Sequence, residues 1–499
     1  MEVTTDHSLD PTDWPALRLQ SHRMLDDMLD YLEHLRDRPV WQPIPAPLRA
    51  RFREALPVAP TDLSKVHASF MQEVLPYAAG NAHPGFMGWV HGGGTAVGML
   101  AEMLAGGLNA NVGGRDQMPV EVERQITHWM RELFGFPASA SGLFVTGTSM
   151  ANLIGVLVAR TAALGTRVRQ QGVNTSEAGG NTRLVAYASA GAHGCVAQAM
   201  DLSGLGRQAL RVLAVNERYE MDTTELERAI ARDRASGFTP FLIVGTAGTV
   251  NVGAIDDLAA LADIAAAEKI WLHIDGAYGA LGMLAPDIAP RLNGIQRADS
   301  IAFDFHKWGQ VPYDAGFILV RDGELHQKTF AAPAAYLRRE ARGLAAGSPW
   351  PCDFGPDLSR GFRALKTWFT FKVYGTEKLG RMISATCALA RYLAERIAVT
   401  AELELLAPVS LNIVCFRYRC ELDAEGADQL NADIVADMQI AGLAAPSTTT
   451  LNGQLAIRAA IVNHRTRRQD IDQLIAATLR YGAAHLAEPR THSIHGSTS

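Results

Sequence analysis

The chain alternates between short apolar runs and longer segments whose apolar residues recur at helical spacing. The apolar runs between residues 142 and 320 are 142–146, 183–189, 210–215, 241–248, 270–275, 300–305 and 315–320. Continuous apolar strands that alternate with helices are typical of a parallel sheet covered on both faces. The pattern therefore predicts an α/β fold, in which sites form at the carboxyl ends of the strands.

The segments on either side of this region follow other patterns. Residues 1–84 combine an amphipathic helical stretch with a proline-rich linker, which predicts a helical arm that packs on another subunit or on its own domain. Residues 85–375 contain the predicted sheet and are expected to form one large domain. Strands and helices then separate, so residues 376–486 are expected to form a small α+β domain and residues 487–499 a disordered tail.

Composition and charge narrow the class of protein. With 499 residues, of which 48% are hydrophobic and 20% charged, the chain is expected to be soluble and globular. A net charge of −6 without a long basic block argues against nucleic-acid binding, and the apolar windows are too short for a membrane span. The five cysteines lack metal-ligand spacing and no signal-peptide pattern is visible, so we expect a cytoplasmic protein without a metal.

Four polar features each follow a predicted strand. Residues 147–149 (GTS) open a helix, where backbone N–H groups and the helix dipole suit a phosphate, although such residues also cap helices. His193 follows the second run, where a histidine can also be a capping or core residue. Asp275 ends an apolar strand, and Lys307 follows the next strand. A carboxylate and an amine in such apolar surroundings need partners, unless the aspartate caps a helix.

Pyridoxal phosphate is a cofactor that needs all four features. It requires a lysine for its Schiff base, an acid against its pyridine nitrogen and a cradle for its phosphate, and a flat group on its ring helps. The acid keeps the ring nitrogen protonated, so that the ring can accept electrons. Each feature alone is ambiguous, but their joint occurrence predicts a pyridoxal phosphate site around Lys307 and Asp275.

The motifs around these residues also resemble those of a known family. DFHKWG contains Lys307, HIDGAYG contains Asp275, SAGAH ends at His193, and TGTSMAN covers the predicted phosphate cradle. From about residue 12 to about residue 480 the chain resembles the group II pyridoxal-phosphate-dependent amino-acid decarboxylases, the family of aromatic-L-amino-acid decarboxylase. The resemblance implies the aspartate-aminotransferase fold (fold type I), with a mostly parallel seven-stranded sheet. It also implies a homodimer whose active site lies at the subunit interface.

The resemblance further implies roles for individual residues. The catalytic residues would be Lys307, Tyr336, His193 and Asp275. The cofactor would contact Gly147, Thr148, Ser149, His193, Thr249, Asp275, Ala277, His306 and Lys307. The amino-acid substrate would contact Phe86, Trp89, His91, Gly92, Asn111 and Arg458.

A tyrosine bears on the reaction that the resemblance implies. Residues 330–340 resemble the family's mobile catalytic loop, whose tyrosine protonates the substrate carbanion across the dimer interface. Tyr336 stands at that position, although a tyrosine there can also be an ordinary packing residue. Relatives that make aldehydes often carry phenylalanine instead. Tyr336 therefore favours simple decarboxylation of an L-amino acid to its amine and carbon dioxide.

The chain departs from the family pattern near the cofactor. Asp304 stands where relatives often have asparagine, and a carboxylate beside a phosphate repels it unless the carboxylate is paired or turned away. Val250 stands where relatives often have a second threonine, which leaves Thr249 as the expected cofactor contact. The pocket stretch 91–94 (HGGG) lacks the proline and the hydroxyl residue of aromatic decarboxylases.

These departures leave the substrate open. Trp89 and Phe86 suit an aromatic side chain, which is our first expectation. His91, Asn111 and Arg115 suit an acidic or polar one. An aldehyde synthase is a further alternative within the family. An aminotransferase that uses Arg458 for a second carboxylate, and a non-catalytic binding protein, are alternatives outside this reaction.

Overall fold

The computed structural model describes residues 8–173, 182–332 and 338–487. Its larger sheet has seven strands in the order β2-β8-β7-β6-β5-β3-β4. They are β2 (Ser141–Val145), β3 (Arg183–Ser189), β4 (Leu210–Leu213), β5 (Phe238–Thr246), β6 (Trp271–Asp275), β7 (Ser300–Asp304) and β8 (Gly316–Val320). Only β8 runs antiparallel to its neighbours within this sheet. The predicted mostly parallel seven-stranded sheet is therefore confirmed, strand by strand.

Helices cover both faces of this sheet because its strands are apolar on both faces. Along β3, Leu184, Ala186 and Ala188 pack with helices α6 and α8, while Val185 and Tyr187 pack in the core that includes α9 and α10. The helices around the sheet are α4 (Ala96–Leu108), α5 (Met118–Phe134), α6 (Thr148–Leu164), α7 (Val168–Gln171), α8 (Cys195–Leu202), α9 (Thr223–Ala235), α10 (Leu258–Glu268) and α11 (Gly323–Phe330). Residue parity along each strand thus decides which helical layer a side chain joins.

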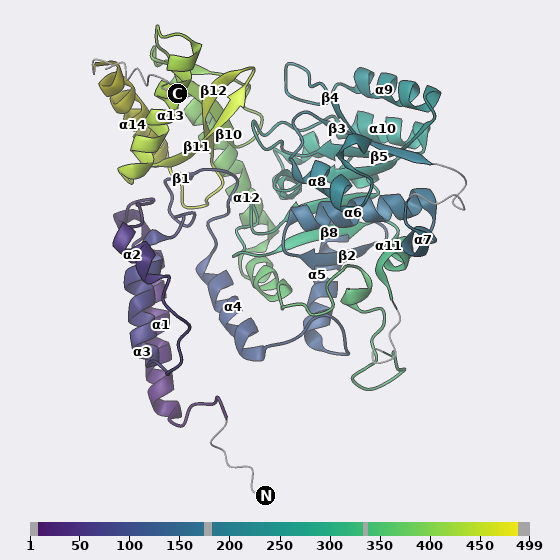
Figure 1. Cartoon of the computed structure of the whole chain (residues 1–499), viewed down its shortest axis with the longest axis horizontal. Helices are drawn as coiled ribbons and strands as arrows, with labels where there is room; N and C mark the ends of the chain where they lie inside the picture. Colours follow the sequence, from purple (N-terminus) through teal and green to yellow (C-terminus); the bar gives the residue numbers. More distant parts are fainter. Residues whose placement is uncertain (1–7, 174–181, 333–337, 488–499) are drawn as a thin grey trace, which may run out of the picture.

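A second sheet lies beside the first (Figure 1). Its order is β1-β11-β12-β10-β9, and it is antiparallel except where β1 joins β11. The strands are β1 (Phe86–Met87), β9 (Leu403–Leu405), β10 (Ile413–Tyr418), β11 (Ala445–Leu451) and β12 (Gln454–Ala460), with helices α13 (Ala424–Ile440) and α14 (Arg468–Ala487). Helix α12 (Ala364–Ala398) connects the two sheets and is interrupted at Gly375, whose dihedral angles are not helical. Strand β1 belongs to the second sheet although it precedes the first sheet in sequence.

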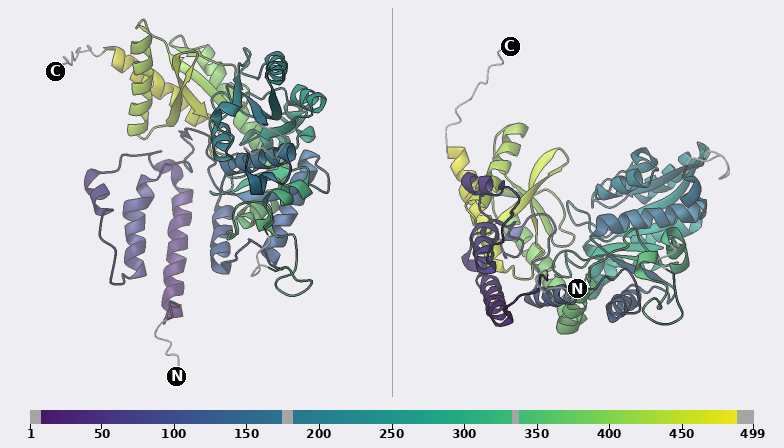
Figure 2. Two further views of the ribbon diagram at one scale, coloured as in Figure 1. Left: turned by 45° about the vertical axis from the view of Figure 1, so that its right-hand side comes forward. Right: turned by 60° about the horizontal axis from the view of Figure 1, so that its bottom comes forward.

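The N-terminal helices project from the rest of the chain (Figure 2). They are α1 (Trp14–Glu33), α2 (Ala46–Arg51) and α3 (Leu63–Ser69). Helix α1 contains no buried residue, and even its apolar residues Trp14 and Leu19 are 60% and 76% exposed. The residues expected to form a tail beyond position 487 lie outside the described part of the chain.

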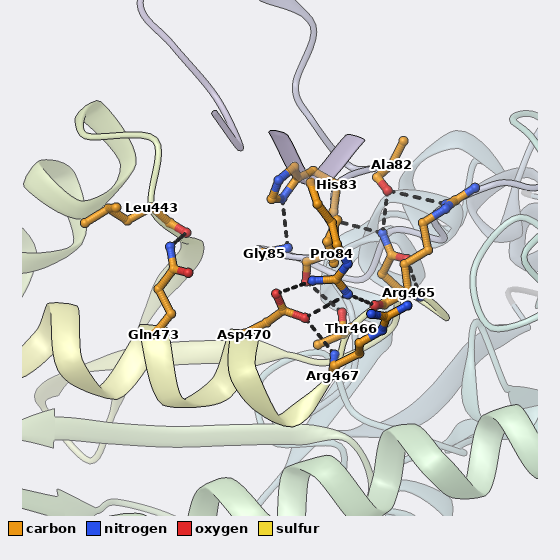
Figure 3. Close-up of polar contacts among 12 residues, drawn as sticks. Ala82, His83, Pro84, Gly85, Leu443, Arg465, Thr466, Arg467, Asp470 and Gln473 are labelled. Atoms are coloured by element: carbon orange, nitrogen blue, oxygen red, sulfur yellow. Dashed lines mark hydrogen bonds and ion pairs between the residues drawn. The ribbon is translucent and has the colours of Figure 1, made fainter. Parts of the chain in front are cut away.

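The segment that leads into β1 is fastened to the C-terminal part of the chain (Figure 3). Asn463 Nδ2 donates to three successive carbonyl oxygens, those of residues 81–83, at 3.0–3.1 Å. Thr466 Oγ1 donates to the carbonyl oxygen of Pro84 at 2.7 Å. Residues that immediately follow this segment are thereby held above the carboxyl ends of the large-sheet strands, where the candidate site lies.

Candidate active site

A cavity of about 450 Å³ lies between the two sheets. The large sheet contributes residues that follow β2, β3, β6 and β7, and the second sheet contributes residues of β11 and β12. Among the residues predicted from the sequence, the cavity is lined by Trp89, His91, Gly147, Thr148, Ser149, His193, Asp275, Ala277, His306, Lys307 and Arg458. Parallel strands bring their carboxyl ends to one edge, so residues 160 positions apart in sequence (147 and 307) meet there.

Lys307 lies three residues beyond the end of β7 and is paired with a carboxylate. Its Nζ is 2.9 Å from Asp304 Oδ2. Burial alone lowers the pKa of the Lys307 ammonium, but the charge and hydrogen bond of Asp304 outweigh that effect, so the pKa is raised. The amine is therefore held protonated in the geometry described.

Asp304 connects this lysine to the start of helix α6. Its side chain is 2% exposed, and its Oδ1 accepts a hydrogen bond from Thr148 N at 2.7 Å. His306 Nε2 is 3.5 Å from Asp304 Oδ2, while His306 Nδ1 accepts from Ala315 N at 2.9 Å. Burial lowers the pKa of His306 to about 4, so its ring is neutral near neutral pH. The Asp304 carboxylate, which stands where relatives often have asparagine, is thus paired with Lys307. Pairing is one of the two conditions under which a carboxylate can lie beside a phosphate.

Asp275 is a buried carboxylate at the end of β6. Its Oδ1 accepts from Ala277 N at 3.1 Å, and its Oδ2 accepts from Asn152 Nδ2 at 3.0 Å. Burial raises the pKa of Asp275, against the charge of Lys307 and these two donors. Sequence reasoning missed Asn152, although its place on α6, one turn after the predicted phosphate cradle, marks it as facing the same edge of the sheet.

The start of α6 suits an anionic group. Gly147 is the residue before the first turn, and a side chain there would meet no atom closer than 3.7 Å. The Thr148 hydroxyl is buried and has no hydrogen-bond partner among the described residues. An orphaned hydroxyl at a helix N-terminus, a lysine amine and a buried carboxylate together fit the phosphate, aldehyde and ring nitrogen of pyridoxal phosphate. We call residues 147–149, His193, Asp275 and 304–307 the cofactor half of the cavity.

Aromatic rings line the opposite side. The ring of His91 lies 5.7 Å from those of both Phe86 and Trp89, nearly parallel to Phe86 at 13°. Tyr313 contacts His91 edge-on at 5.7 Å and lies 4.2 Å from the ring of His306. Burial, with a smaller effect of the Lys307 charge, lowers the pKa of His91, so this ring is neutral and acts as an aromatic surface.

Tyr313 is a lining residue that sequence reasoning missed. It stands six residues after Lys307 in the same FDFHKWGQVPYDAG stretch, which is the signal that could have indicated it. We call Trp89, His91, Tyr313 and Arg458 the substrate half of the cavity.

Arg458 is buried in the substrate half and is bonded mainly to the protein backbone. It lies on β12 and is 3% exposed. Its Nε and Nη2 donate to the carbonyl oxygen of Val250, and its Nη1 donates to Trp89 O at 3.2 Å and to Ser447 Oγ at 3.1 Å. The guanidinium therefore joins three separate segments of the cavity wall.

Four of the predicted residues do not line the cavity. Phe86 packs behind His91, and Gly92 N donates to the carbonyl of His306, so close that a side chain on Gly92 would meet that oxygen. Asn111 Oδ1 accepts from the backbone of Arg360 and Gly113, and Thr249 Oγ1 accepts from Ala254 N.

Two further residues of the sequence analysis lie elsewhere. Tyr336 lies outside the described residues. Arg115 lies over the ring of Trp350, with 4.5 Å between its guanidinium carbon and the ring centre.

Comparisons with known proteins show the family of this chain. Residues 45–419 match the model of the pyridoxal-dependent decarboxylase conserved domain. The chain is 32% identical to an aromatic-L-amino-acid decarboxylase of Bacillus atrophaeus, over 92% of this chain and 94% of that protein. It is 30% identical to an L-2,4-diaminobutyrate decarboxylase of Rhizobium meliloti (strain 1021), over 87% of this chain and 86% of that protein.

A solved structure shares the fold. The crystal structure of Oryza sativa TDC with PLP and tryptamine has a TM-score of 0.86 and 23% sequence identity, over 96% of this chain and 100% of that chain. The family match covers most of the chain, so the resemblance inferred from the sequence and the fold-type-I assignment are confirmed. The chain belongs to the pyridoxal-dependent decarboxylase family and is an amino-acid carboxy-lyase with pyridoxal phosphate as its cofactor.

Proposed function

We propose that this decarboxylase acts on an aromatic L-amino acid and releases the amine and carbon dioxide. The observation that carries this proposal is the set of rings in the substrate half, with His91 between Trp89 and Tyr313 and neutral through burial. A flat substrate side chain gains apolar contact and ring–ring interactions there. The backbone bonds of Arg458 argue against an acidic side chain, because they occupy the guanidinium that would bind a second carboxylate.

The cofactor half would hold pyridoxal phosphate. Bound there, the cofactor draws electrons from the bonds of the substrate α-carbon into its ring. Lys307 would hold it covalently, while Thr148 and Ser149 would bind its phosphate at the start of α6. The Asp275 carboxylate would hold a proton on the ring nitrogen, and the imidazole of His193 would cover a ring face. Asp304 sets the charge of the Lys307 amine through their 2.9 Å contact.

We assign the proton donor to Tyr336. A phenol that delivers a proton to the α-carbon completes decarboxylation, whereas its absence leaves that carbon open to oxidation by dioxygen, which with water gives the aldehyde, ammonia and hydrogen peroxide. Tyr336→Phe should therefore divert product from amine to aldehyde. Tyr313→Phe is the control, since it removes the hydroxyl of another tyrosine, one that lines the cavity. Unchanged amine output from Tyr336→Phe would remove this residue from the reaction.

The test of the substrate is a panel of the twenty common amino acids, with amine, aldehyde, keto acid and carbon dioxide all measured. We expect carbon dioxide and amine in equal amounts, with the highest kcat/KM for an aromatic substrate. Preference for an acidic or polar amino acid would overturn the substrate assignment. Aldehyde as the main product would identify an aldehyde synthase, and a keto acid without carbon dioxide would identify transamination.

We also propose that the chain is a cytoplasmic homodimer with its active site at the subunit interface, built from an arm (1–84), a large domain (85–375) and a small domain (376–486). Helix α1 supports this proposal, because it projects from the rest of the chain (Figure 2). Its apolar residues Trp14 and Leu19 are exposed, and burial of such surface in a second copy stabilises a dimer. The five unpaired cysteines support a reducing compartment. Within the described residues, no helix has the length and apolar character to cross a membrane. Leu19→Glu should shift the sedimentation coefficient to that of a monomer.

A further inference from the structure

A chain of buried hydrogen bonds extends behind Asp275, away from the cavity. Asp275 Oδ2 contacts Asn152 Nδ2 at 3.0 Å, and Asn152 Oδ1 contacts His273 Nε2 at 2.8 Å. His273 Nδ1 contacts Ser300 Oγ at 2.7 Å, and Trp271 Nε1 donates to the same oxygen at 2.9 Å. Asn152, His273 and Ser300 are each at most 1% exposed. Asn152 and His273 fall within the quoted motifs TGTSMAN and HIDGAYG, but the resemblance assigned no role to either of them, nor to Ser300.

Donor and acceptor chemistry fixes which atom donates and which accepts in each hydrogen bond of this series. An ionised Asp275 can only accept, so the amide of Asn152 turns its Nδ2 toward Asp275 and its Oδ1 toward His273. His273 Nε2 must then carry a proton. Burial lowers the pKa of His273 to about 3, so the ring is neutral and its Nδ1 accepts. The Ser300 hydroxyl consequently donates to Nδ1, while its oxygen accepts from the indole of Trp271, which can only donate.

Local packing leaves this arrangement little freedom. His273 and Ser300 are register partners on the neighbouring parallel strands β6 and β7. Asn152 and Gly155 share one face of α6, and a side chain on Gly155 would lie 2.6 Å from the imidazole, so the glycine leaves room for the ring. The remaining hydrogen of Asn152 Nδ2 points to Cys195 Sγ at 3.2 Å. Every polar atom of the Asn152 side chain is thus used.

We propose that His273, with Ser300 and Trp271 behind it, is a positioning residue that fixes the orientation of Asn152 and thereby keeps Asp275 ionised. The opposite tautomer of His273 would present a bare Nε2, favour a rotated Asn152 amide and place that amide's oxygen against Asp275. Aligned hydrogen bonds in a buried site also strengthen one another, so the donor at Asp275 is stronger than an isolated amide. This inference rests on the proposed function in one respect, the assignment of Asp275 to the ring nitrogen.

The chain contains a matched control for this histidine. His326 is fully buried, burial lowers its pKa to about 3, and its Nδ1 is 2.8 Å from Ser141 Oγ. His273 and His326 therefore share burial, neutrality and a serine partner. They differ in that the series of hydrogen bonds from His273 leads through Asn152 to Asp275, which lines the cavity. His326 has no such connection among the hydrogen bonds described and does not line the cavity. Substitution of His326 reports the general cost of removing a buried histidine.

The first experiment reads the tautomer directly. In holoenzyme labelled with ¹⁵N-histidine, NMR at neutral pH should show His273 as the neutral Nε2–H form, assigned by its loss in His273→Phe. The Nδ1–H tautomer or a charged ring would overturn the proposal. The tautomer itself is read in the unaltered chain, and the variant serves only to assign the signal, for which His273→Gln replaces His273→Phe if the latter fails to fold.

The second experiment reads the effect on the ring nitrogen, with ¹⁵N-labelled pyridoxal phosphate in the holoenzyme. His273→Phe should move the pyridine ¹⁵N shift toward the unprotonated value and lower kcat by about tenfold to a hundredfold, with little change in KM. That range corresponds to one lost buried hydrogen bond in a network ending on a charge. His326→Phe should change neither the pyridine ¹⁵N shift nor kcat. An equal effect in both variants would show that His273 contributes only to stability, as any buried histidine does, and would contradict the proposal.

Two milder variants complete the design. Ser300→Ala should shift the pyridine signal in the same direction as His273→Phe but less, whereas Ser141→Ala should not shift it. Asp275→Ala separates the two proposals. A pyridine shift that does not respond to Asp275→Ala contradicts the proposed function, while one that responds to Asp275→Ala but not to His273→Phe contradicts this inference alone.

Discussion

The two halves of the cavity differ in how their side chains are held. In the cofactor half, Asp275 and Asp304 are each 2% exposed and each accepts hydrogen bonds on both oxygens. In the substrate half, Trp89 is 59% exposed and is held mainly by ring contacts. The first half consists of residues that follow large-sheet strands, whereas Trp89, His91 and Arg458 come from segments joined to the second sheet. Under the proposed function, the cofactor chemistry is therefore fixed by one rigid sheet, while substrate choice depends on how a second part docks onto it.

The largest expected effect tests the cofactor half. Lys307→Ala removes the amine that would hold pyridoxal phosphate, so the chain should gain no cofactor mass after borohydride reduction. Decarboxylation should fall by at least about 10³-fold, as when a covalent nucleophile is lost. Lys366→Ala is the control, because Lys366 is a buried lysine, 3% exposed, that pairs with Glu102 and does not line the cavity. Cofactor mass retained on Lys307→Ala would refute the assignment of the lysine.

Sequence reasoning predicted the cofactor half better than the substrate half, for a physical reason. Lys307, Asp275 and His193 each follow a strand, and parallel topology brings all strand ends to one edge, so linear spacing was enough. The rings of the substrate half meet through tertiary packing between distant segments, which no local period encodes. Asn111 illustrates the limit, because its position suggested the pocket, whereas its side-chain Oδ1 accepts from the backbone N–H groups of Gly113 and Arg360.

Asn152 and Tyr313 illustrate the converse limit. Asn152 is the last residue of the TGTSMAN motif and Tyr313 stands four residues after DFHKWG, yet their roles depend on which side chain stands opposite them across the sheet edge. Asn152 meets Asp275 from a helix 123 positions earlier in sequence. The local sequence pattern predicts the strands and where they end. Which side chain contacts which other side chain across the sheet edge follows only from the folded structure.

A second prediction concerns the substrate half. Trp89→Ala removes the exposed ring that stacks on His91, so kcat/KM for an aromatic amino acid should fall by roughly 10-fold or more, the range for lost contact in an apolar pocket. The fall for a small aliphatic amino acid should be slighter. Trp129→Ala is the control, since Trp129 stacks on Phe371 outside the cavity lining. An equal loss for both substrate classes would show that this ring does not select the substrate.

A third, smaller effect concerns Asp304. Asparagine at this position retains an acceptor for Thr148 N but removes the negative charge beside Lys307, so the pKa of Lys307 should fall. More of the amine is then neutral at a given pH, and covalent capture of added pyridoxal phosphate, followed by absorbance, should become several-fold faster at neutral pH. Asp314→Asn, which removes a carboxylate paired with Arg363 in the same stretch, should leave the capture rate unchanged. Slower capture in Asp304→Asn would indicate that the carboxylate assists binding rather than restraining the amine.

The smallest expected effect concerns the turn that joins the two halves. Asp256 closes this turn by accepting from Thr246 N at 2.8 Å and Met221 N at 2.7 Å, and the turn presents Val250 to Arg458. Burial raises the pKa of Asp256 to about 6, above the value of about 3.9 for an unfolded chain. The folded state therefore binds the proton more tightly between these values, so the free energy of unfolding should fall as pH rises from about 4 to about 6, by on the order of 2 kcal/mol.

The measurement is the pH dependence of stability rather than its level. Asp256→Asn also removes one of two acceptors, so the variant is expected to be less stable at every pH, but its stability should lack the contribution that falls between about pH 4 and pH 6. Asp257→Asn, which alters the exposed helix cap next in sequence, should keep that contribution. If Asp256→Asn and the unaltered chain lose stability in parallel across this range, the carboxylate is ionised throughout. The turn would then be held by a charge, and the junction between the two halves would be as tightly fixed as the cofactor half itself.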